Sequence, residues 1–335
     1  MYLTGSRNDA RVLKYHSILS DREIMKISNY LGTSPENLPF LDVDLDKDNL
    51  LFIDPRAIRI ASLRGNFNSS EYAKKAVKSM DSFFDIITEA VLRQDATGEV
   101  DLHAQDLLKK FKEPNETRLG MSTKSPKGIG GGEVVGKNIW DVLSKDLLAL
   151  VKIGLLKQVE ELSVFVPKVG KDITSDLTTR LIFEVLVKFT HDMMKRYTKL
   201  ELLGKESENL RAWSANLNKW VENKFYLPHY KDEPFLLVPL EWVRPNLVIS
   251  REKYFQNGCL TYIQDKQATI GSDGKRHAPT KKDLREKPEY MCNLRNIIKI
   301  TLQADEDKKN LVEYVLKLMD DKYKVLSVQE LSKYL

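Results

Sequence analysis

The chain has 335 residues, of which 42% are hydrophobic and 30% are charged, and its formal net charge is +5. These values are typical of a globular protein with enough apolar side chains to bury a core, and they exclude a chain that is disordered throughout. The 53 basic and 48 acidic residues are spread along the whole length, so the charge favours a polyanionic partner only weakly.

Cysteine content and hydropathy bear on the cellular location. Cys259 and Cys292 are too few for a disulfide framework, and no Cys/His zinc pattern is present, which fits a reducing interior. The segment MYLTGSRNDARVLKYH lacks the apolar centre of a secretory signal. No apolar run approaches the roughly 18 to 20 residues that span a bilayer. We therefore expect a cytoplasmic protein with no membrane partner.

Helical spacing of apolar residues recurs through the first 200 residues. The first of these helices is opened by a capping box, Ser20 with Glu23, whose side chains satisfy reciprocal backbone donors. The predicted helices cover about residues 21–31, 70–92, 138–156 and 177–200. Between two of them, residues 113–137 have no periodicity and are rich in glycine, serine and lysine, which is typical of a long loop.

Strand patterns are shorter. Residues 41–46 alternate between apolar and acidic side chains, which predicts an exposed strand feeding a buried strand at 50–53. The acidic run from Asp42 to Asp48 opens like a calcium loop, but it lacks the glycine and the glutamate that an EF-hand needs, so a solvated strand face is the better interpretation. A further short strand is expected at 162–166.

The second half of the chain differs in pattern. Trp213 and Trp220 are predicted on a helix, residues 224–239 form a hairpin around a polar turn, and the chain ends in helices at about 305–323 and after Ser327. The expected fold is therefore a helix-rich α+β protein with a small mixed sheet. We expect two lobes, residues 1–205 and a smaller hairpin-containing lobe at 206–335.

A glycine-rich segment suggests anion binding. The sequence GGEVVGKN at 131–138 is one residue short of a Walker A motif, has Asn138 where magnesium would need a hydroxyl, and follows no buried strand. A true P-loop is therefore disfavoured, and a looser phosphate contact and a plain flexible loop remain open. Cations concentrate around these glycines just before a predicted helix N-terminus, which suits an anion: Arg118, Lys124, Lys127 and Lys137.

Carboxylates and hydroxyls crowd a second predicted helix start, GKDITSDLTT at 170–179. Asp172 and Asp176, with Glu116, are the expected ligands of a Mg²⁺ ion whose activated water attacks phosphorus. Lys171 and Lys137 are placed to steady the phosphate. Helix capping explains the same residues without chemistry; on that alternative Ser175 is the better candidate for the cap and Asp176 for function.

Several sequence blocks together resemble an uncharacterised bacterial protein family over most of the chain. They are FIDP at 52–55, ETRLGMS at 116–122, the glycine segment leading to IWDVLS, VGKDITSDLTT at 169–179 and LLVP at 236–239. The resemblance implies an association with restriction and antiviral-defence genes. Glu241 follows LLVP where the family pattern has a lysine, which puts a catalytic lysine there in doubt.

The leading hypothesis is a bacterial nucleic-acid-processing hydrolase, a Mg²⁺-dependent nuclease or effector subunit of phage defence, with Glu116, Asp172 and Asp176 as catalytic and metal-binding residues. One alternative is a non-catalytic adaptor that binds a partner protein, such as a helicase or ATPase, in a defence complex. Another is nucleotide binding or hydrolysis at the glycine segment. The basic stretch 275–282 suits either nucleic-acid contact or a solvated loop. Substrate and oligomeric state stay open.

Overall fold

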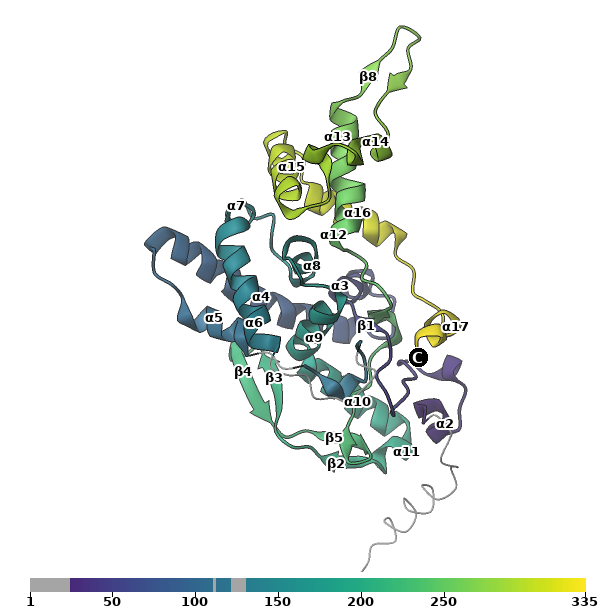
Figure 1. Cartoon of the computed structure of the whole chain (residues 1–335). Coiled ribbons are helices and arrows are strands. Elements are labelled where there is room, and N and C mark those ends of the chain that lie inside the picture. The colour runs from purple at the N-terminus through teal and green to yellow at the C-terminus, as the bar shows by residue number, and fades with distance from the viewer. Residues whose placement is uncertain (1–24, 111–112, 122–130) are drawn as a thin grey trace, which may run out of the picture.

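The computed structural model describes residues 25–110, 113–121 and 131–335 (Figure 1). Helices dominate and the strands are short, which confirms the predicted helix-rich α+β class. The α-helices are α2 (Ile27–Leu31), α3 (Pro55–Arg64), α4 (Ser70–Thr97), α5 (Leu102–Lys109), α6 (Gly131–Asp141), α7 (Leu148–Lys152), α8 (Leu162–Phe165), α9 (Lys171–Leu181), α10 (Phe183–Arg196), α11 (Thr198–Glu201), α12 (Arg251–Tyr254), α13 (Leu260–Lys266), α14 (Lys281–Arg285), α15 (Leu294–Glu306), α16 (Leu311–Lys322) and α17 (Val328–Leu331).

The strands of the described residues pair antiparallel in small, separate sheets. They are β1 (Phe52–Ile53) with β7 (Val243–Arg244), β2 (Gly204–Glu206) with β5 (Tyr226–Tyr230) and β6 (Glu233–Pro234), β3 (Leu210–Ser214) with β4 (Lys219–Asn223), and β8 (Thr269–Ile270) with β9 (Arg276–His277). The predicted hairpin is β5–β6. Its turn residues, Lys231 and Asp232, both have positive φ, as a type I′ turn requires.

Helix α4 lies at the centre of the fold and confirms the helix predicted from residue 70. Its buried face recurs at steps of three and four through Ala73, Met80, Phe83 and Ile87. Helices α3, α9 and α10 and strand β3 all pack against it. Helix α3 is opened by the FIDP block: Asp54 caps it by accepting from the Arg56 N–H at 2.9 Å, and Pro55 occupies the first turn, where its missing N–H costs nothing.

Helix α9 begins earlier than predicted. It starts at Lys171, and the residue before it, Gly170, has no side chain that could cap the helix. It ends at Leu181, and α10 begins at Phe183. Ser175 and Asp176 therefore lie inside the helix, so the capping explanation for Ser175 is wrong. Its hydroxyl instead accepts from the Ile53 N–H at 2.9 Å and joins β1 to α9.

The glycine segment is helical where the structure describes it. Residues 131–141 form α6 rather than the end of a loop, so the backbone amides of this segment are not arranged to wrap a phosphate. Gly136 is there because α5 approaches closely: a Cβ on it would lie 2.2 Å from the Leu108 carbonyl oxygen. The P-loop alternative thus loses its structural basis.

Three local predictions are wrong for tertiary reasons. Asp42, expected on a solvated strand, is buried and accepts from the backbone N–H and the hydroxyl of Ser28, both at 2.7 Å. Residues 162–165 form helix α8, not a strand. Trp213 and Trp220 are paired directly across β3 and β4, with ring centroids 5.5 Å apart, and are not on a helix.

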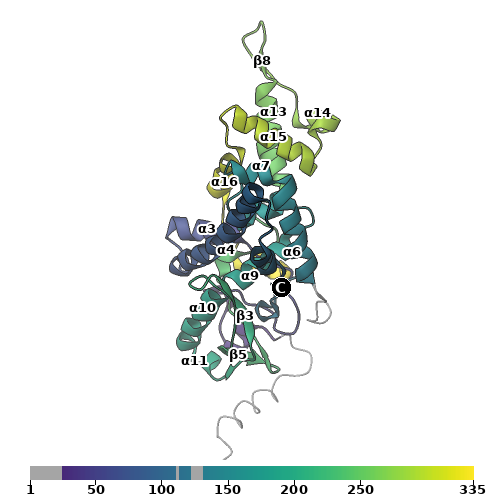
Figure 2. The same cartoon turned by 90° about the vertical axis from the view of Figure 1, so that its left-hand side faces the viewer.

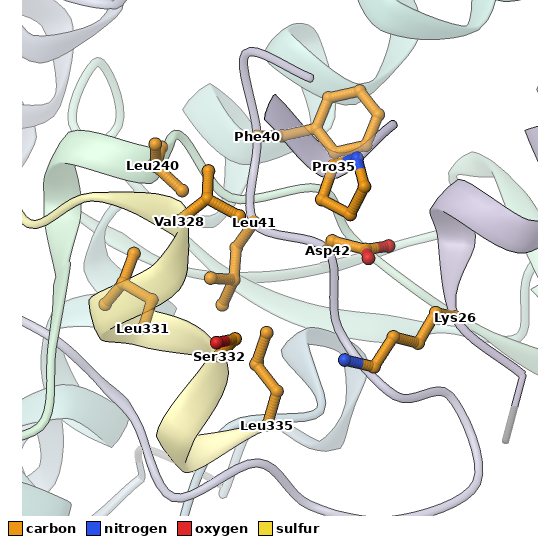
Figure 3. Close-up of a pocket in the computed structure, with 10 residues that line it drawn as sticks. All are labelled: Lys26, Pro35, Phe40, Leu41, Asp42, Leu240, Val328, Leu331, Ser332 and Leu335. Carbon is orange, nitrogen blue, oxygen red and sulfur yellow. The ribbon is translucent and has the colours of Figure 1, made fainter. Parts of the chain in front are cut away.

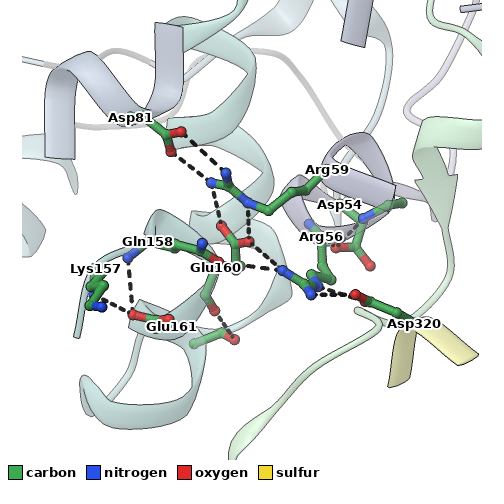
Figure 4. A network of polar contacts seen from close by, with 11 residues as sticks. Asp54, Arg56, Arg59, Asp81, Lys157, Gln158, Glu160, Glu161 and Asp320 are labelled. Carbon is green, nitrogen blue, oxygen red and sulfur yellow. Dashed lines mark hydrogen bonds and ion pairs between the residues drawn. The ribbon is translucent and has the colours of Figure 1, made fainter. Parts of the chain in front are cut away.

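One hydrophobic core runs through both predicted lobes, and β1 pairs with β7 across the predicted boundary at 205/206. What projects from the body is residues 251–322, from α12 to α16, which we call the projecting lobe (Figures 1 and 2). Figure 4 shows the polar network at its base: Arg56 binds Asp320 of α16 at 2.8 Å and contacts Glu160, while Arg59 binds Glu160 at 2.8 Å and Asp81 at 2.7 Å.

After the projecting lobe the chain returns to the body. Arg244 Nη1 donates to the Lys324 carbonyl at 2.9 Å, and α17, opened by the predicted capping box of Ser327 and Glu330, buries Leu331 near α2. Figure 3 shows the cavity beneath α17, lined by Leu41, Leu240 and other side chains. Its volume of about 40 Å³ holds at most a few water molecules, which excludes a small-molecule site there.

No helix in the described parts of the chain is both long and apolar enough to cross a membrane.

The packing of Gly136 gives a stability prediction. Gly136→Ala should lower the free energy of unfolding by about 1 to 3 kcal/mol, because the added methyl group meets backbone of α5 that cannot move aside easily. Urea denaturation followed by circular dichroism measures the change. Lys137→Ala, on the exposed side of the same helix, is the matched control and should stay within about 0.5 kcal/mol of wild type. Equal stability of the two variants would contradict the close packing of α5 and α6.

Candidate functional site: a carboxylate cluster beside helix α9

The two regions singled out in the sequence meet in space. Residues 113–121 lie along α9 and are held there by Arg180, whose guanidinium contacts both carboxylate oxygens of Glu116 at 3.2 Å and donates to the Glu113 carbonyl at 2.7 Å. Both charged side chains are buried. Farther along, the Met121 N–H donates to the carboxylate of Asp172, and Gly120 lies beside the same carboxylate.

This arrangement assigns Glu116 a different role from the predicted one. Its charge is neutralised by Arg180, and its carbonyl accepts from the Leu236 N–H at 2.7 Å, so it fixes the segment between α9 and the LLVP block. In the part of the chain that the structure describes, no three His, Cys, Asp or Glu side chains are grouped so that they could hold a metal ion. The predicted set of Glu116, Asp172 and Asp176 is therefore not a preassembled metal site.

Asp176 lies one helical turn after Asp172, so the two carboxylates share one face of α9. Burial raises the pKa of Asp176 to about 8, with further increases from the negative charges of Asp172, Glu113 and Asp48 and a smaller opposing effect from Arg180. This carboxyl group is therefore mostly protonated at neutral pH, which is unusual for an aspartate.

Two of these neighbours come from outside the predicted set. Burial raises the pKa of Asp48, which Arg118 opposes and the charges of Glu113 and Asp172 reinforce. Burial also raises the pKa of Asp172, against the Met121 N–H and Lys171. We call Asp48, Glu113, Asp172 and Asp176 the carboxylate cluster. Glu113 is exposed, so the cluster reaches the surface.

The sequence contains only partial indications that Asp48 and Glu113 belong to the carboxylate cluster. Asp48 closes the acidic run that begins at Asp42, and Glu113 opens the segment that contains Glu116. Nothing in the run distinguishes Asp48, which reaches the cluster, from Asp42, which binds Ser28 of α2. That distinction depends on which way the chain turns after residue 44.

The predicted phosphate-binding residues have separate positions. Arg118 is buried, has an unusual φ of 56°, and its Nε has no hydrogen-bond partner among the described residues, while its charge acts on Asp48. Lys171 donates to the Pro245 carbonyl at 2.9 Å and lies over the ring of Phe52. Ser175 binds β1, Lys137 is exposed on α6, and Lys124 and Lys127 lie outside the described residues.

The arrangement suits two kinds of chemistry. Carboxylate oxygens are the ligands that hard divalent cations prefer, and a cation would relieve the repulsion among Asp48, Glu113, Asp172 and Asp176, although in this structure these side chains, too, would have to move inward to share one ion. A carboxyl group with a pKa of about 8 is also matched to giving or taking a proton near neutral pH. Arg118, with an unused buried donor, adds a cation at the edge of the same cluster.

Fold and site together define a helix-rich α+β protein with an acidic cluster, to which α9 contributes Asp172 and Asp176 and two other segments contribute Asp48 and Glu113. A family described as a domain of unknown function, DUF8370, matches residues 31–250, and the chain belongs to this family. The match contains the whole carboxylate cluster and ends where the projecting lobe begins. No curated protein and no solved structure matches the chain.

The raised pKa of Asp176 gives a pH-dependent stability prediction. In the unfolded chain an aspartate has its usual pKa near 3.8, whereas the folded value is about 8. As pH rises from 4 to 8, the unfolded state loses the proton first, so the folded state is progressively destabilised and the loss is complete above pH 8. Asp176→Asn, which cannot ionise, should therefore gain on the order of 2 to 3 kcal/mol over wild type at pH 8.5 and nothing at pH 3.5.

Denaturation at both pH values measures this difference. Asp141→Asn, a half-exposed carboxylate paired with Lys145, is the matched control and should show no comparable gain. A pH-independent difference between Asp176→Asn and wild type would contradict the perturbed pKa.

Proposed function

We propose that the protein is a cytoplasmic nucleic-acid-processing hydrolase, a Mg²⁺-dependent nuclease or effector subunit of bacterial phage defence, with its active site at the carboxylate cluster. The observation that carries the proposal is the half-buried carboxyl group of Asp176: burial raises its pKa to about 8, and the negative charges of Asp172, Glu113 and Asp48 contribute to the rise. Structural carboxylates are usually paired with cations; here the charges of three other carboxylates act on Asp176 and only Arg180 opposes them.

Residue roles follow from position. Asp172 and Asp176, on one face of α9, are the proposed principal Mg²⁺ ligands, joined by Asp48 or Glu113 as the side chains turn inward when the ion binds. The bound ion would supply an activated water for attack on phosphorus. We assign Arg118 to offset charge on the phosphate, because its own charge acts on Asp48 and its buried Nε has no hydrogen-bond partner among the described residues. Glu116 and Arg180 are positioning residues that hold segment 113–121 against α9.

Cleavage assays test this proposal. Wild-type protein should cleave single- or double-stranded DNA or RNA in the presence of Mg²⁺, and Asp176→Asn should lower the rate by about 100-fold or more, because removing a charged group that binds the ion removes much of the electrostatic stabilisation at the reacting phosphate. Fluorescent oligonucleotides of each type, with Mg²⁺ or EDTA, give the measurement.

The assay's controls separate chemistry from folding. Asp141→Asn should cleave at the wild-type rate, and Asp176→Asn is expected to be the more stable protein above neutral pH, so unfolding does not explain its loss. If Asp176→Asn cleaves as fast as wild type, the cluster is not the active site. If wild type cleaves none of the substrates, the adaptor alternative takes the place of the nuclease.

Proton release on cation binding is a second, independent prediction. At pH 7 the carboxyl group of Asp176 is mostly protonated, so binding of Mg²⁺ should release about one proton per ion, and at pH 9.5 it should release almost none. Calorimetric titrations in two buffers of different ionisation enthalpy count the protons. Asp176→Asn should bind Mg²⁺ more weakly and without proton release; equal binding by both proteins would remove Asp176 from the ligand set.

A further inference from the structure

The projecting lobe ends in a thin, exposed hairpin. In both views β8 and β9 extend from α13 and α14 away from the body (Figures 1 and 2). The strands pair Thr269 with His277 and Ile270 with Arg276, and every residue from 272 to 278 is exposed. Ile270, an apolar side chain, is 71% exposed. The hairpin therefore contributes little to the core, and its position suggests contact with another molecule.

Charge is distributed unevenly between the body and the C-terminal part. Residues 251–335 hold 17 basic and 13 acidic residues, so they carry +4 of the chain's formal +5. Within them, residues 269–282 hold four Lys or Arg and one Asp. Lys275 and Lys282 are exposed and have no ion-pair partner among the described residues, whereas Arg276 is paired with Asp265 of α13 at 2.5 Å. The hairpin and its base therefore present positive charge to solvent.

The base of the hairpin contains further cations close to one another. Lys281 donates to the Gln256 carbonyl at 2.6 Å, which fixes the start of α14 against the π-helical turn Phe255–Cys259. Burial lowers the pKa of Lys281, and the positive charges of Lys322 and Arg285 lower it further, so these like charges are near neighbours. A polyanion lying along the lobe would relieve this repulsion.

We propose that the β8–β9 hairpin, with Lys282 at its base, is the surface by which the protein holds double-stranded DNA. A two-stranded ribbon fits the major groove of B-form DNA, whereas the deep, narrow major groove of A-form RNA does not admit it. Lys275 and Lys282 would contact phosphates, Arg276 would exchange its exposed pairing with Asp265 for a phosphate, and Ile270 would lie toward the groove. The inference deepens the proposed nuclease function, because it names the substrate's binding arm, which lies outside the residues 31–250 that match the family.

Fluorescence anisotropy with a 30-base-pair DNA duplex tests the proposal, using the full chain in EDTA so that no cleavage occurs. The triple variant Lys275→Gln, Arg276→Gln, Lys282→Gln should bind at least about 10-fold more weakly than wild type at 100 mM salt. The slope of log Kd against log salt should fall by about 2 to 3, as expected for three lost phosphate contacts.

The matched control is Lys75→Gln, Lys78→Gln, Lys219→Gln, which removes the same charge from three exposed sites on the body and should bind DNA like wild type. Failure of wild type to bind the duplex would overturn the proposal, as would equal binding and salt dependence of the two triple variants. If the hairpin variant loses binding to phosphatidylserine vesicles but keeps its DNA binding, the hairpin is a membrane-binding surface instead, and the DNA proposal is overturned.

The nuclease proposal fails separately. If DNA binding depends on the hairpin but no substrate is cleaved, the proposal for the hairpin stands and the nuclease proposal is rejected.

Discussion

The buried ion pair between Arg180 and Glu116 holds the candidate site together. Arg180 is near the C-terminal end of α9, and by binding Glu116 and the Glu113 carbonyl it draws residues 113–121 along the helix. Breaking such a pair on one side leaves an uncompensated buried charge and typically costs about 3 to 5 kcal/mol. That cost keeps the segment in place. The segment in turn brings Glu113 and the Met121 N–H to α9. Its Arg118 carbonyl also binds Asn49, the neighbour of Asp48.

The same stiffness explains how unfavourable electrostatics persist. The four carboxylates influence one another's pKa values, and they would move apart if their backbone were free, yet Asp172 and Asp176 are fixed on one helix and the Glu113 backbone is held by Arg180. Arg118, Lys171 and Arg180 offset part of the repulsion, and burial together with the remaining repulsion raises the pKa of Asp176 to about 8, so that this carboxyl group holds a proton. Holding groups in an arrangement that is costly without a ligand is common at functional sites and unnecessary in a purely structural helix.

Local patterns allowed some elements to be predicted, and tertiary partners decided the rest. The spacing on α4, the capping box at Ser327 and the polar turn at Lys231 are properties of a few neighbouring residues, and these predictions are confirmed. Gly136 packs against the Leu108 backbone of α5, the Trp213 strand pairs with the Trp220 strand, and Ser175 binds Ile53, which is 122 residues away. For the candidate site, the crowding of polar residues at 170–179 was enough to single out Asp172 and Asp176. Glu116 is paired with Arg180 and so is not a member of the cluster, whereas Asp48 is a member. Both facts depend on contacts between residues far apart in the sequence, which a local pattern does not reveal.

The uneven charge of the chain connects the two proposals. A polyanion approaching the carboxylate cluster is repelled until a cation is bound there, so the body by itself is a poor surface for nucleic acid. The projecting lobe carries most of the net positive charge and is tied to α3 of the body by Arg56 and Asp320 and through the returning C-terminal segment. Binding energy from such an arm would hold the substrate while Mg²⁺ neutralises the cluster, so affinity would come from the lobe and reactivity from the body. Under this division, substrate affinity falls with salt and cleavage rate depends on the cation.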